Sequence, residues 1–308
     1  MRWVVVALLL TACGRLDFEA IGMSSGSDGG AGGDGGAGGD GSAMFDGGVD
    51  PLGPWSAPAQ MTVLGTSGRS DRAPSLTDDL LEIYFDSNRN SPSTNDLFMA
   101  TRSSATAGWN APIELVALDS PQSDGSPEVS GDGLSLWFSS DRSGSSSCDI
   151  WVSTRATRGS AWGTPVIDTS LSTTGCEADP ALADDALAMA ISGGANADLI
   201  YIATRTTTTG PFSIAAPVAE LDTAYAQHAG ALRDSERELF FDRCVDISTC
   251  DVYVATRAST SDSFATPVRV DTVNLSILNA DVWVSRDRHT MYFSSDKTGD
   301  MEIYAATR

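Results

Sequence analysis

Histidine and basic residues are scarce in this chain. Its 308 residues include two histidines, His228 and His289, and 19 basic residues against 41 acidic ones, which gives a net charge of −22. The sequence has no Gly-x-Ser-x-Gly elbow, no Walker loop, no His-Glu-x-x-His motif and no zinc spacing of paired cysteines, and two isolated histidines do not make a catalytic triad. A surface this acidic repels phosphate backbones, so nucleic acid is not expected as a partner.

The N-terminal apolar run is too short to cross a bilayer as a helix. It covers residues 3–10 after Arg2, and the following Leu10-Thr11-Ala12-Cys13 resembles a bacterial lipobox, in which the cysteine is lipidated after cleavage. We predict a signal peptide over residues 1–12 and a lipid anchor at Cys13, with no other membrane contact. An ordinary signal peptide beside a chance cysteine is the alternative. Gly14, where inner-membrane lipoproteins carry aspartate, favours the outer membrane of a bacterial envelope.

Large side chains are nearly absent from residues 24–54, which are mostly Gly, Asp, Ala and Ser. Such a segment cannot bury apolar surface, so we predict a flexible, hydrated tether over residues 13–53. Calcium-binding nonapeptide repeats have a similar Gly and Asp spacing. They also require a large apolar residue at a fixed position, and none occurs before Met44.

The rest of the chain repeats with a period of about fifty residues. Five segments end in Thr-Arg, and their arginines lie 53, 50, 52 and 51 residues apart, at Arg102, Arg155, Arg205, Arg257 and Arg308. Within each unit, apolar runs of period two are separated by Asp- and Gly-containing turns, which predicts antiparallel strands. An aromatic residue and a proline follow Thr-Arg, and proline belongs on a sheet edge. Four strands in about fifty residues are typical of a propeller blade.

One copy of the edge strand is out of place. Trp55-Ser-Ala-Pro58 precedes the first unit, whereas the last unit stops at Arg308 without an edge strand. Circular closure would let residues 54–65 complete the last blade. We therefore predict an all-β, five-bladed β-propeller over residues 54–308, with four-stranded antiparallel blades at 70–119, 120–172, 173–223, 224–274 and 275–308 plus 54–65. An open solenoid is the alternative, but it would need caps and leaves the extra strand unexplained.

A family resemblance supports this fold. Residues 126–142, Ser-Pro-Glu-Val-Ser-Gly-Asp-Gly-Leu-Ser-Leu-Trp-Phe-Ser-Ser-Asp-Arg, followed by Asp149-Ile-Trp151, resemble the WD40-like (PD40) repeat of TolB-type propellers. The resemblance covers all five blades and is weakest in the third. It implies a periplasmic or surface lipoprotein that acts as a binding module, although the repeat specifies a fold and not a chemistry.

Four cysteines remain in the propeller region. An even number in an exported chain favours disulfides over metal ligation. Cys148 lies in a turn between strands and Cys176 in the next connection between blades, on the same face; Cys244 and Cys250 flank one hairpin turn. We predict the pairs Cys148–Cys176 and Cys244–Cys250, with free thiols or another connectivity as the alternative.

Polar residues stand just before each innermost strand, where the mouth of the channel is expected. They are Asp71, Asp124, Glu177, Gln227, His228 and Asn279, with Leu278 beside the last. The three carboxylates offer oxygen ligands for a cation such as Ca²⁺, and no other cofactor is predicted. Five-bladed furanosidases also use three acids from separate blades, so catalysis by Asp71, Asp124 and Glu177 is an alternative. Turn chemistry of aspartate is the third interpretation, and it is favoured.

The residues that recur in every blade are expected to be structural. The Thr-Arg pairs are predicted to bond between strands or blades, and Trp137 and Trp151 to pack between blades, whereas Trp283 could face the channel or a neighbouring blade. We therefore predict a non-enzymatic envelope lipoprotein whose propeller is a scaffold for an envelope protein or a glycan. The alternative is a glycoside hydrolase or another polysaccharide-acting enzyme that uses the carboxylates of the channel mouth.

Overall fold

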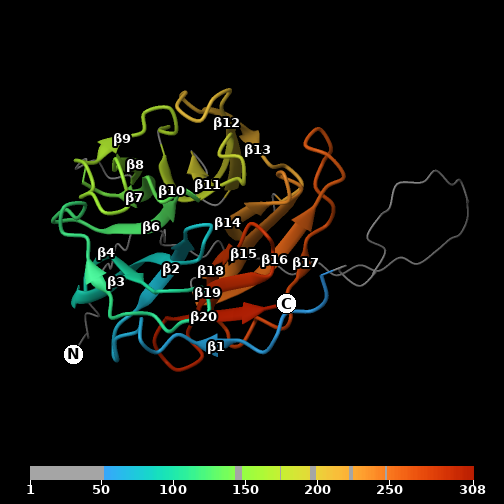
Figure 1. Ribbon diagram of the computed structural model, residues 1–308. Helices are drawn as coiled ribbons and strands as arrows, with labels where there is room; N and C mark the ends of the chain where they lie inside the picture. The colour runs from blue at the N-terminus through green and yellow to red at the C-terminus, as the bar shows by residue number, and fades with distance from the viewer. Residues whose placement is uncertain (1–51, 143–147, 174, 195–198, 222–224, 247) are drawn as a thin grey trace, which may run out of the picture.

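The computed structural model describes residues 52–142, 148–173, 175–194, 199–221, 225–246 and 248–308. The predicted signal peptide, the lipidation site Cys13 and most of the predicted tether lie outside these ranges. Within them, twenty strands form five four-stranded antiparallel sheets arranged in a ring (Figure 1). No helix in the described ranges is long and apolar enough to cross a membrane. The chain is a five-bladed β-propeller, as predicted.

Each blade runs outward from an innermost strand, in chain order in the first four blades. From inside to outside, the blades are β2 (Asp71–Leu76), β3 (Glu82–Ser91), β4 (Thr94–Thr101) and β5 (Ile113–Glu114); β6 (Asp124–Val129), β7 (Ser135–Ser140), β8 (Asp149–Thr154) and β9 (Val166–Ile167); β10 (Cys176–Leu182), β11 (Ala188–Gly194), β12 (Leu199–Thr204) and β13 (Ser213–Pro217); β14 (Ala226–Arg233), β15 (Glu238–Asp246), β16 (Thr249–Thr256) and β17 (Val268–Arg269); β18 (Asn279–Val284), β19 (Thr290–Ser295), β20 (Glu302–Thr307) and β1 (Ala59–Gln60).

The last blade is closed by the first strand of the ring. β1 pairs antiparallel with β20, with Ala59 opposite Ala305 and Gln60 opposite Tyr304. The pairing extends on one side through the amide of Ser56, which donates to the carbonyl of Thr307 at 2.7 Å. β1 and β20 lie next to the labelled C-terminus in Figure 1. Because closure occupies an otherwise open edge, the predicted ring is confirmed and the solenoid is excluded.

The hydrophobic core is divided among the five interfaces between blades. Each interface holds one cluster of buried side chains, and these clusters contain the fully buried Phe and Leu residues of the second strands. Trp137 packs between blades two and three, and Trp151 between blades one and two, as predicted. Trp283 lies in the cluster with Leu76 and Ile83 of the first blade and also lines the channel, so it meets both of the expected environments.

The five Thr-Arg arginines all make the same two contacts. Each guanidinium lies 4.2–4.5 Å from the centroid of the aromatic ring that precedes the edge strand of the same blade. Each Nε also donates to a carbonyl in the turn between the first and second strands. The hydrogen bonds were expected from the repeat, whereas the stacking, worth about 0.5–2 kcal/mol per pair, was not. The pairs are Arg102 on Trp109, Arg155 on Trp162, Arg205 on Phe212, Arg257 on Phe264 and Arg308 on Trp55.

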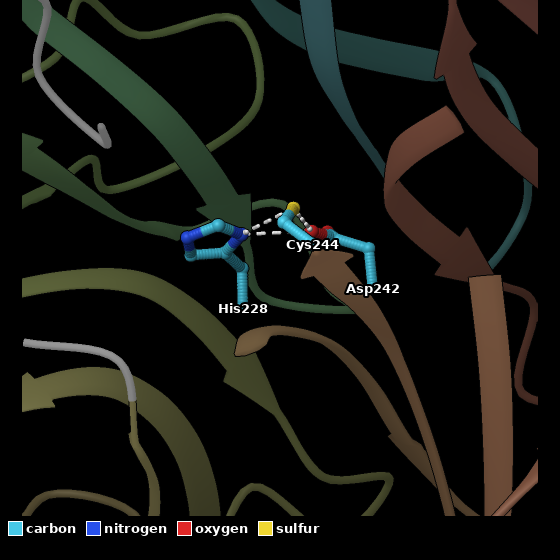
Figure 2. Close-up of side chains that lie close together, drawn as sticks. All are labelled: His228, Asp242 and Cys244. Carbon is cyan, nitrogen blue, oxygen red and sulfur yellow. Dashed lines mark hydrogen bonds and ion pairs between the residues drawn. The ribbon is translucent and has the colours of Figure 1, made fainter. Parts of the chain in front are cut away.

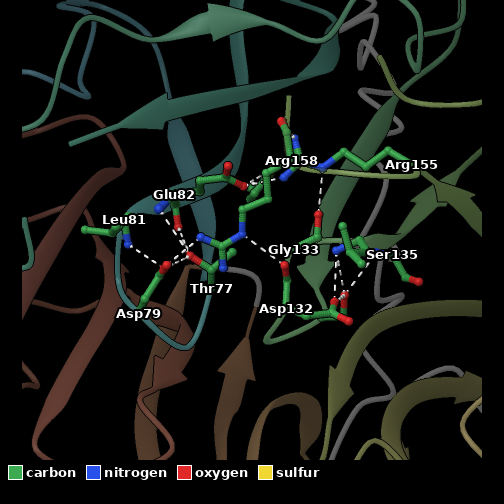
Figure 3. Close-up of polar contacts among 12 residues, drawn as sticks. Thr77, Asp79, Leu81, Glu82, Asp132, Gly133, Ser135, Arg155 and Arg158 are labelled. Carbon is green, nitrogen blue, oxygen red and sulfur yellow. Dashed lines mark hydrogen bonds and ion pairs between the residues drawn. The ribbon is translucent and has the colours of Figure 1, made fainter. Parts of the chain in front are cut away.

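Two arginines also join the second blade to the first (Figure 3). Arg155 donates to Glu82 at 2.5 Å, and both side chains are largely buried. Arg158 contacts Asp79 at 2.5 Å and donates through Nε to the carbonyl of Asp132 at 2.9 Å. The guanidinium can serve several acceptors at once because its donors form a rigid fork.

Both predicted disulfides are present. Cys148–Cys176 joins the second and third blades across 28 residues of sequence, and Cys244–Cys250 joins neighbouring strands of one hairpin across 6 residues. The first therefore restrains the ring, and the second restrains a single turn.

The two disulfides should contribute unequally to stability. Replacing Cys148 and Cys176 by serine is expected to lower the free energy of unfolding by roughly 1 kcal/mol more than replacing Cys244 and Cys250, because the entropy of loop closure grows with loop length. Urea denaturation of the two double variants measures the difference. A larger loss in the hairpin variant would contradict this account.

Candidate functional site

The polar residues predicted at the channel mouth hold the connections between blades. The side chains of Asp71, Asp124, Glu177 and Asn279 each accept a hydrogen bond from a backbone amide four or five residues earlier, and Gln227 donates to the carbonyl of Leu221. All five are at most 1% exposed. One residue per blade thus fastens the turn that leads into its innermost strand.

Two of these mouth carboxylates are also paired with arginine. Asp71 contacts Arg89, and Asp124 lies 2.6 Å from Arg142; neither aspartate side chain is exposed. Arg89 lies near the end of β3, and Arg142 follows the end of β7. This geometry favours turn chemistry for the mouth residues. A calcium ion at the mouth stays a prediction.

Deeper in the channel, every innermost strand is interrupted by a β-bulge. In four blades the bulge holds a residue other than glycine in the left-handed region, with φ between 47° and 55°. Such conformations cost of order 1–3 kcal/mol and cluster at functional sites. These residues are Ala73, Ser126, Asp179 and Asp281.

The bulges line a small hollow that is open to solvent. Its wall contains all four bulge residues together with Trp283. Three carboxyl groups line it, those of Glu128, Asp179 and Asp281, which come from the second, third and fifth blades.

Ser126 connects two acidic side chains in this channel. Its hydroxyl donates to Oδ1 of Asp179 at 2.7 Å, and its amide donates to Oδ2 of Asp86 at 3.1 Å. Asp86 lies on β3, the second strand of the first blade. Arg72 contacts its other oxygen, Oδ1, at 3.4 Å. Within the described ranges, Oδ2 of Asp179 is buried and has no hydrogen-bond partner. The carboxylate of Asp86 is therefore stabilised by the guanidinium of Arg72, whereas the carboxyl of Asp179 has one oxygen without a hydrogen bond among the described residues.

Both carboxyls hold their protons more tightly than usual. Burial raises the pKa of Asp86 to about 6; Arg72 opposes the rise, and the negative charge of Asp281 adds to it. Burial also raises the pKa of Asp179, with His228 opposing and Asp281 adding. A low-dielectric channel with several acids is the setting in which a carboxyl can carry a proton near neutral pH.

On the fourth blade, His228 and Asp242 face each other across neighbouring strands (Figure 2). Nδ1 of His228 lies 2.7 Å from Oδ2 of Asp242, and Oδ1 of Asp242 accepts the amide of Asp281 at 3.1 Å. Asp242 thus holds the bulge of the fifth blade as Asp86 holds that of the second. Of the predicted site residues, His228 has the most exposed side chain, at 17%.

Arginines cross the other end of the channel. Arg233 donates to the carbonyls of Leu182 and Val284 at 2.8 and 2.5 Å, which spans three blades. Arg286 lies 3.0 Å from Asp78 of the first blade and also donates to the carbonyl of Asp184 in the third. Both arginines line a second small hollow, to which they give a polar floor.

Glu128 lies between the two hollows and lines both. It accepts hydrogen bonds from the hydroxyl of Ser75 at 2.8 Å and the amide of Leu182 at 2.9 Å. Burial raises its pKa to about 7, opposed mainly by Arg233, while Asp78 adds to the rise.

The raised pKa makes Glu128 a source of pH-dependent stability. Because the folded pKa lies above the unfolded one, its contribution is full below about pH 4.5 and is lost as the pH rises through 7. Glu128→Gln, which keeps the shape without the charge, should raise the free energy of unfolding by roughly 1–3 kcal/mol at pH 8 and change it little at pH 4.5. Urea denaturation at both pH values tests this; an equal change at both would contradict it.

Apolar side chains are exposed beside the mouth of the fourth blade. Tyr225, Val245 and Ile277 are 46%, 55% and 63% exposed. Each is next in sequence to a member of one buried cluster, which includes Ala226, Cys244 and Leu278. The three side chains therefore lie around one buried cluster, and Tyr225 is also close in sequence to His228.

The comparisons with known proteins show the fold. No protein-family model and no curated protein matches the sequence. Among solved structures, an α-L-arabinofuranosidase from Podospora anserina matches with a TM-score of 0.56 at 9% identity, over 82% of this chain and 96% of that one. A family 117 glycoside hydrolase from Zobellia galactanivorans gives 0.55 at 13% identity, over 82% and 90%. An endo-arabinase from Bacteroides thetaiotaomicron gives 0.52 at 12% identity, over 79% and 95%.

These likenesses correct one prediction. The non-enzymatic scaffold predicted from the sequence is contradicted, because these three similar propellers are glycoside hydrolases, which favours the polysaccharide-acting alternative. A TolB structure from Acinetobacter baumannii is also similar, at a TM-score of 0.44. The ring predicted from the repeat is present in the structure, whereas the non-enzymatic binding role inferred from it is contradicted.

Proposed function

We propose that this protein is a glycoside hydrolase that acts on polysaccharide, with its chemistry in the central channel. The observation that carries the proposal is the pair Asp86 and Asp179, two carboxyls with raised pKa values that Ser126 links; Asp179 lines a solvent-open hollow, and Asp86 is buried. Glycosidic bonds are commonly hydrolysed by two carboxyl groups, one acidic and one ionised. The similar propellers with such activities support the same class.

The surroundings assign different roles to the two carboxyls. Asp179 is the proposed general acid, because burial and the charge of Asp281 favour its protonated form and because, among the described residues, its Oδ2 has no hydrogen-bond partner. Asp86 is the proposed base, because Arg72 stabilises its ionised form. In this scheme Asp179 gives its proton to the glycosidic oxygen as the bond breaks, and Asp86 takes a proton from the attacking water.

The remaining wall suits a sugar chain that approaches from the mouth. The hollow is open to solvent, and Asp179 lines it. The exposed Tyr225 and its apolar neighbours offer a surface on which the apolar face of the next unit can lie. Because the arginine floor crosses the far end, we propose that a chain enters and leaves by the mouth.

A reducing-sugar assay tests the proposed activity. The folded protein is incubated with arabinan, with arabinose-substituted polysaccharides and with aryl arabinofuranosides, beside polysaccharides that lack arabinose. We expect sugar release from at least one substrate of the arabinose group. Failure to release sugar from any of them, by a protein whose folding is verified by circular dichroism, would overturn the proposed substrate class.

The place of action is also a proposal. Cys13 lies outside the described residues, but its lipobox-like context supports an enzyme anchored by lipid to the outer membrane of a bacterial envelope. Metabolic labelling with a fatty acid of wild type and Cys13→Ser checks the anchor. Equal labelling of both would refute it.

A further inference from the structure

Three possible metal ligands of different chemistry lie together on the fourth blade (Figure 2). Asp242 and Cys244 stand two residues apart on β15, so their side chains share one face of the sheet. His228 is directly opposite Asp242 on β14, and the small Ala226 is opposite Cys244. The ligand atoms of the three residues lie within 4.8 Å of one another.

The distances between these atoms resemble those around a small metal ion. Sγ of Cys244 lies 3.8 Å from Nδ1 of His228 and 3.4 Å from Oδ2 of Asp242. Tetrahedral zinc, with bonds of about 2.0 Å to nitrogen or oxygen and about 2.3 Å to sulfur, places its ligands roughly 3.3–3.7 Å apart. Only the His228–Asp242 pair, now at 2.7 Å, would have to open. A nitrogen, an oxygen and a sulfur ligand together favour zinc over calcium or magnesium.

The disulfide blocks this site. In the Cys244–Cys250 bond the sulfur has no thiolate charge, and thiolate is the form that binds metal. The bond joins directly opposite residues, and the ladder continues on both sides of it, from Arg243 with Asp251 to Asp246 with Thr249. The hairpin can therefore keep its pairing when the bond is opened. Cys148–Cys176 has no such cluster beside it among the described residues.

We propose that His228, Asp242 and Cys244 form a zinc site that is available only when the Cys244–Cys250 disulfide is reduced. A dithiol reductant transfers two electrons and two protons, becomes a disulfide itself and leaves two protein thiols. Zinc then displaces the proton of the Cys244 thiol and binds the sulfur together with one oxygen of Asp242 and one nitrogen of His228. The fourth position stays open to water. The site goes beyond the proposed hydrolysis, which uses other residues.

A pair of cysteine variants tests the proposal without a reductant. Cys250→Ser leaves the Cys244 thiol beside His228 and Asp242, whereas Cys244→Ser removes the ligand and keeps a thiol at 250. Each purified variant is titrated with Co²⁺, a spectroscopic substitute for zinc, and then with Zn²⁺. We expect Cys250→Ser to bind one equivalent of Co²⁺ with a thiolate-to-cobalt charge-transfer band that zinc abolishes. Cys244→Ser and the oxidised wild type should show no band.

Further variants and a fold control complete the test. In the Cys250→Ser background, His228→Ala and Asp242→Asn should each weaken binding by at least about tenfold. Thermal unfolding of every variant verifies that the ring is intact. Equal bands in the two cysteine variants would overturn the proposal, because the sulfur at 244 would then not be the ligand. A folded Cys250→Ser protein without a band would overturn it as well.

Discussion

Asp179→Asn should reduce the turnover of polysaccharide by about 10²–10⁴-fold, the usual contribution of a general acid. The substitution keeps the size of the side chain and the oxygen that accepts the hydroxyl of Ser126 at 2.7 Å, but it cannot donate an ionisable proton. Asparagine also tolerates the left-handed backbone of this position, where φ is 50°. The fold should therefore survive. The measurement is kcat on a polysaccharide substrate, with circular dichroism as the check of folding.

Asp124→Asn is the matched control for this variant. Its carboxylate is also fully buried but bonds to Arg142 and to the amide of Ser120 at the mouth. We expect this variant to lose stability and to retain turnover in its folded fraction. If Asp124→Asn abolished turnover while Asp179→Asn left it unchanged, the chemistry would belong to the mouth and not to the bulge.

Trp55→Ala should cause the largest loss of stability, roughly 3–5 kcal/mol. Trp55 is 7% exposed and packs with Phe293 and Tyr304 in the cluster between blades four and five. Arg308 stacks on its ring at 4.2 Å. The strand that follows Trp55, β1, pairs through only two residues, so the loss of this buried side chain also weakens the closure. Guanidinium denaturation gives the free energy, and hydrogen exchange at Ala305 and Thr307 reports on the seam.

Trp109→Ala is the control that distinguishes a loss of ring closure from the general effect of removing a buried tryptophan. Trp109 is 9% exposed and receives Arg102 at 4.2 Å, so the local contacts match those of Trp55. The edge strand after Trp109 is β5, which follows β4 of the same blade directly in the chain. We expect Trp109→Ala to destabilise without faster exchange in β20. Faster exchange there in both variants would show that Trp55 has no special role in closing the ring.

The fold could be predicted almost completely because its determinants repeat. The Thr-Arg ending, the apolar strands and the aromatic edge recur five times, so a weak copy such as Ile191-Ser-Gly-Gly194 is supported by stronger ones. The misplaced Trp55 strand then required a closed ring. Both disulfides followed from which turns share a face of that ring. What repetition does not indicate is chemistry, because one active site needs residues that differ among the blades.

The channel carboxylates were missed for this reason. The residue after the second-strand phenylalanine is serine in Phe138-Ser139 and Phe293-Ser294, but aspartate at Asp86 and Asp242. The residue at the bulge likewise varies between alanine, serine and aspartate. These departures from the repeat were the available signal. The residues chosen instead, led by Asp71 and Asp124, are those that the repeat keeps similar, and they fasten turns. Burial and pairing with arginine could be seen only in three dimensions.

The hydrogen bond between Ser56 and Thr307 places the two ends of the ring on adjacent strands. A short glycine-rich linker could therefore connect Arg308 to Pro54, and new termini could be opened in any exposed connection between blades. Such circular permutants would carry the same five sheets in the same cyclic order. The propeller does not depend on which blade is synthesised first, and moving the seam from blade to blade would measure how much each interface contributes to holding the circle together.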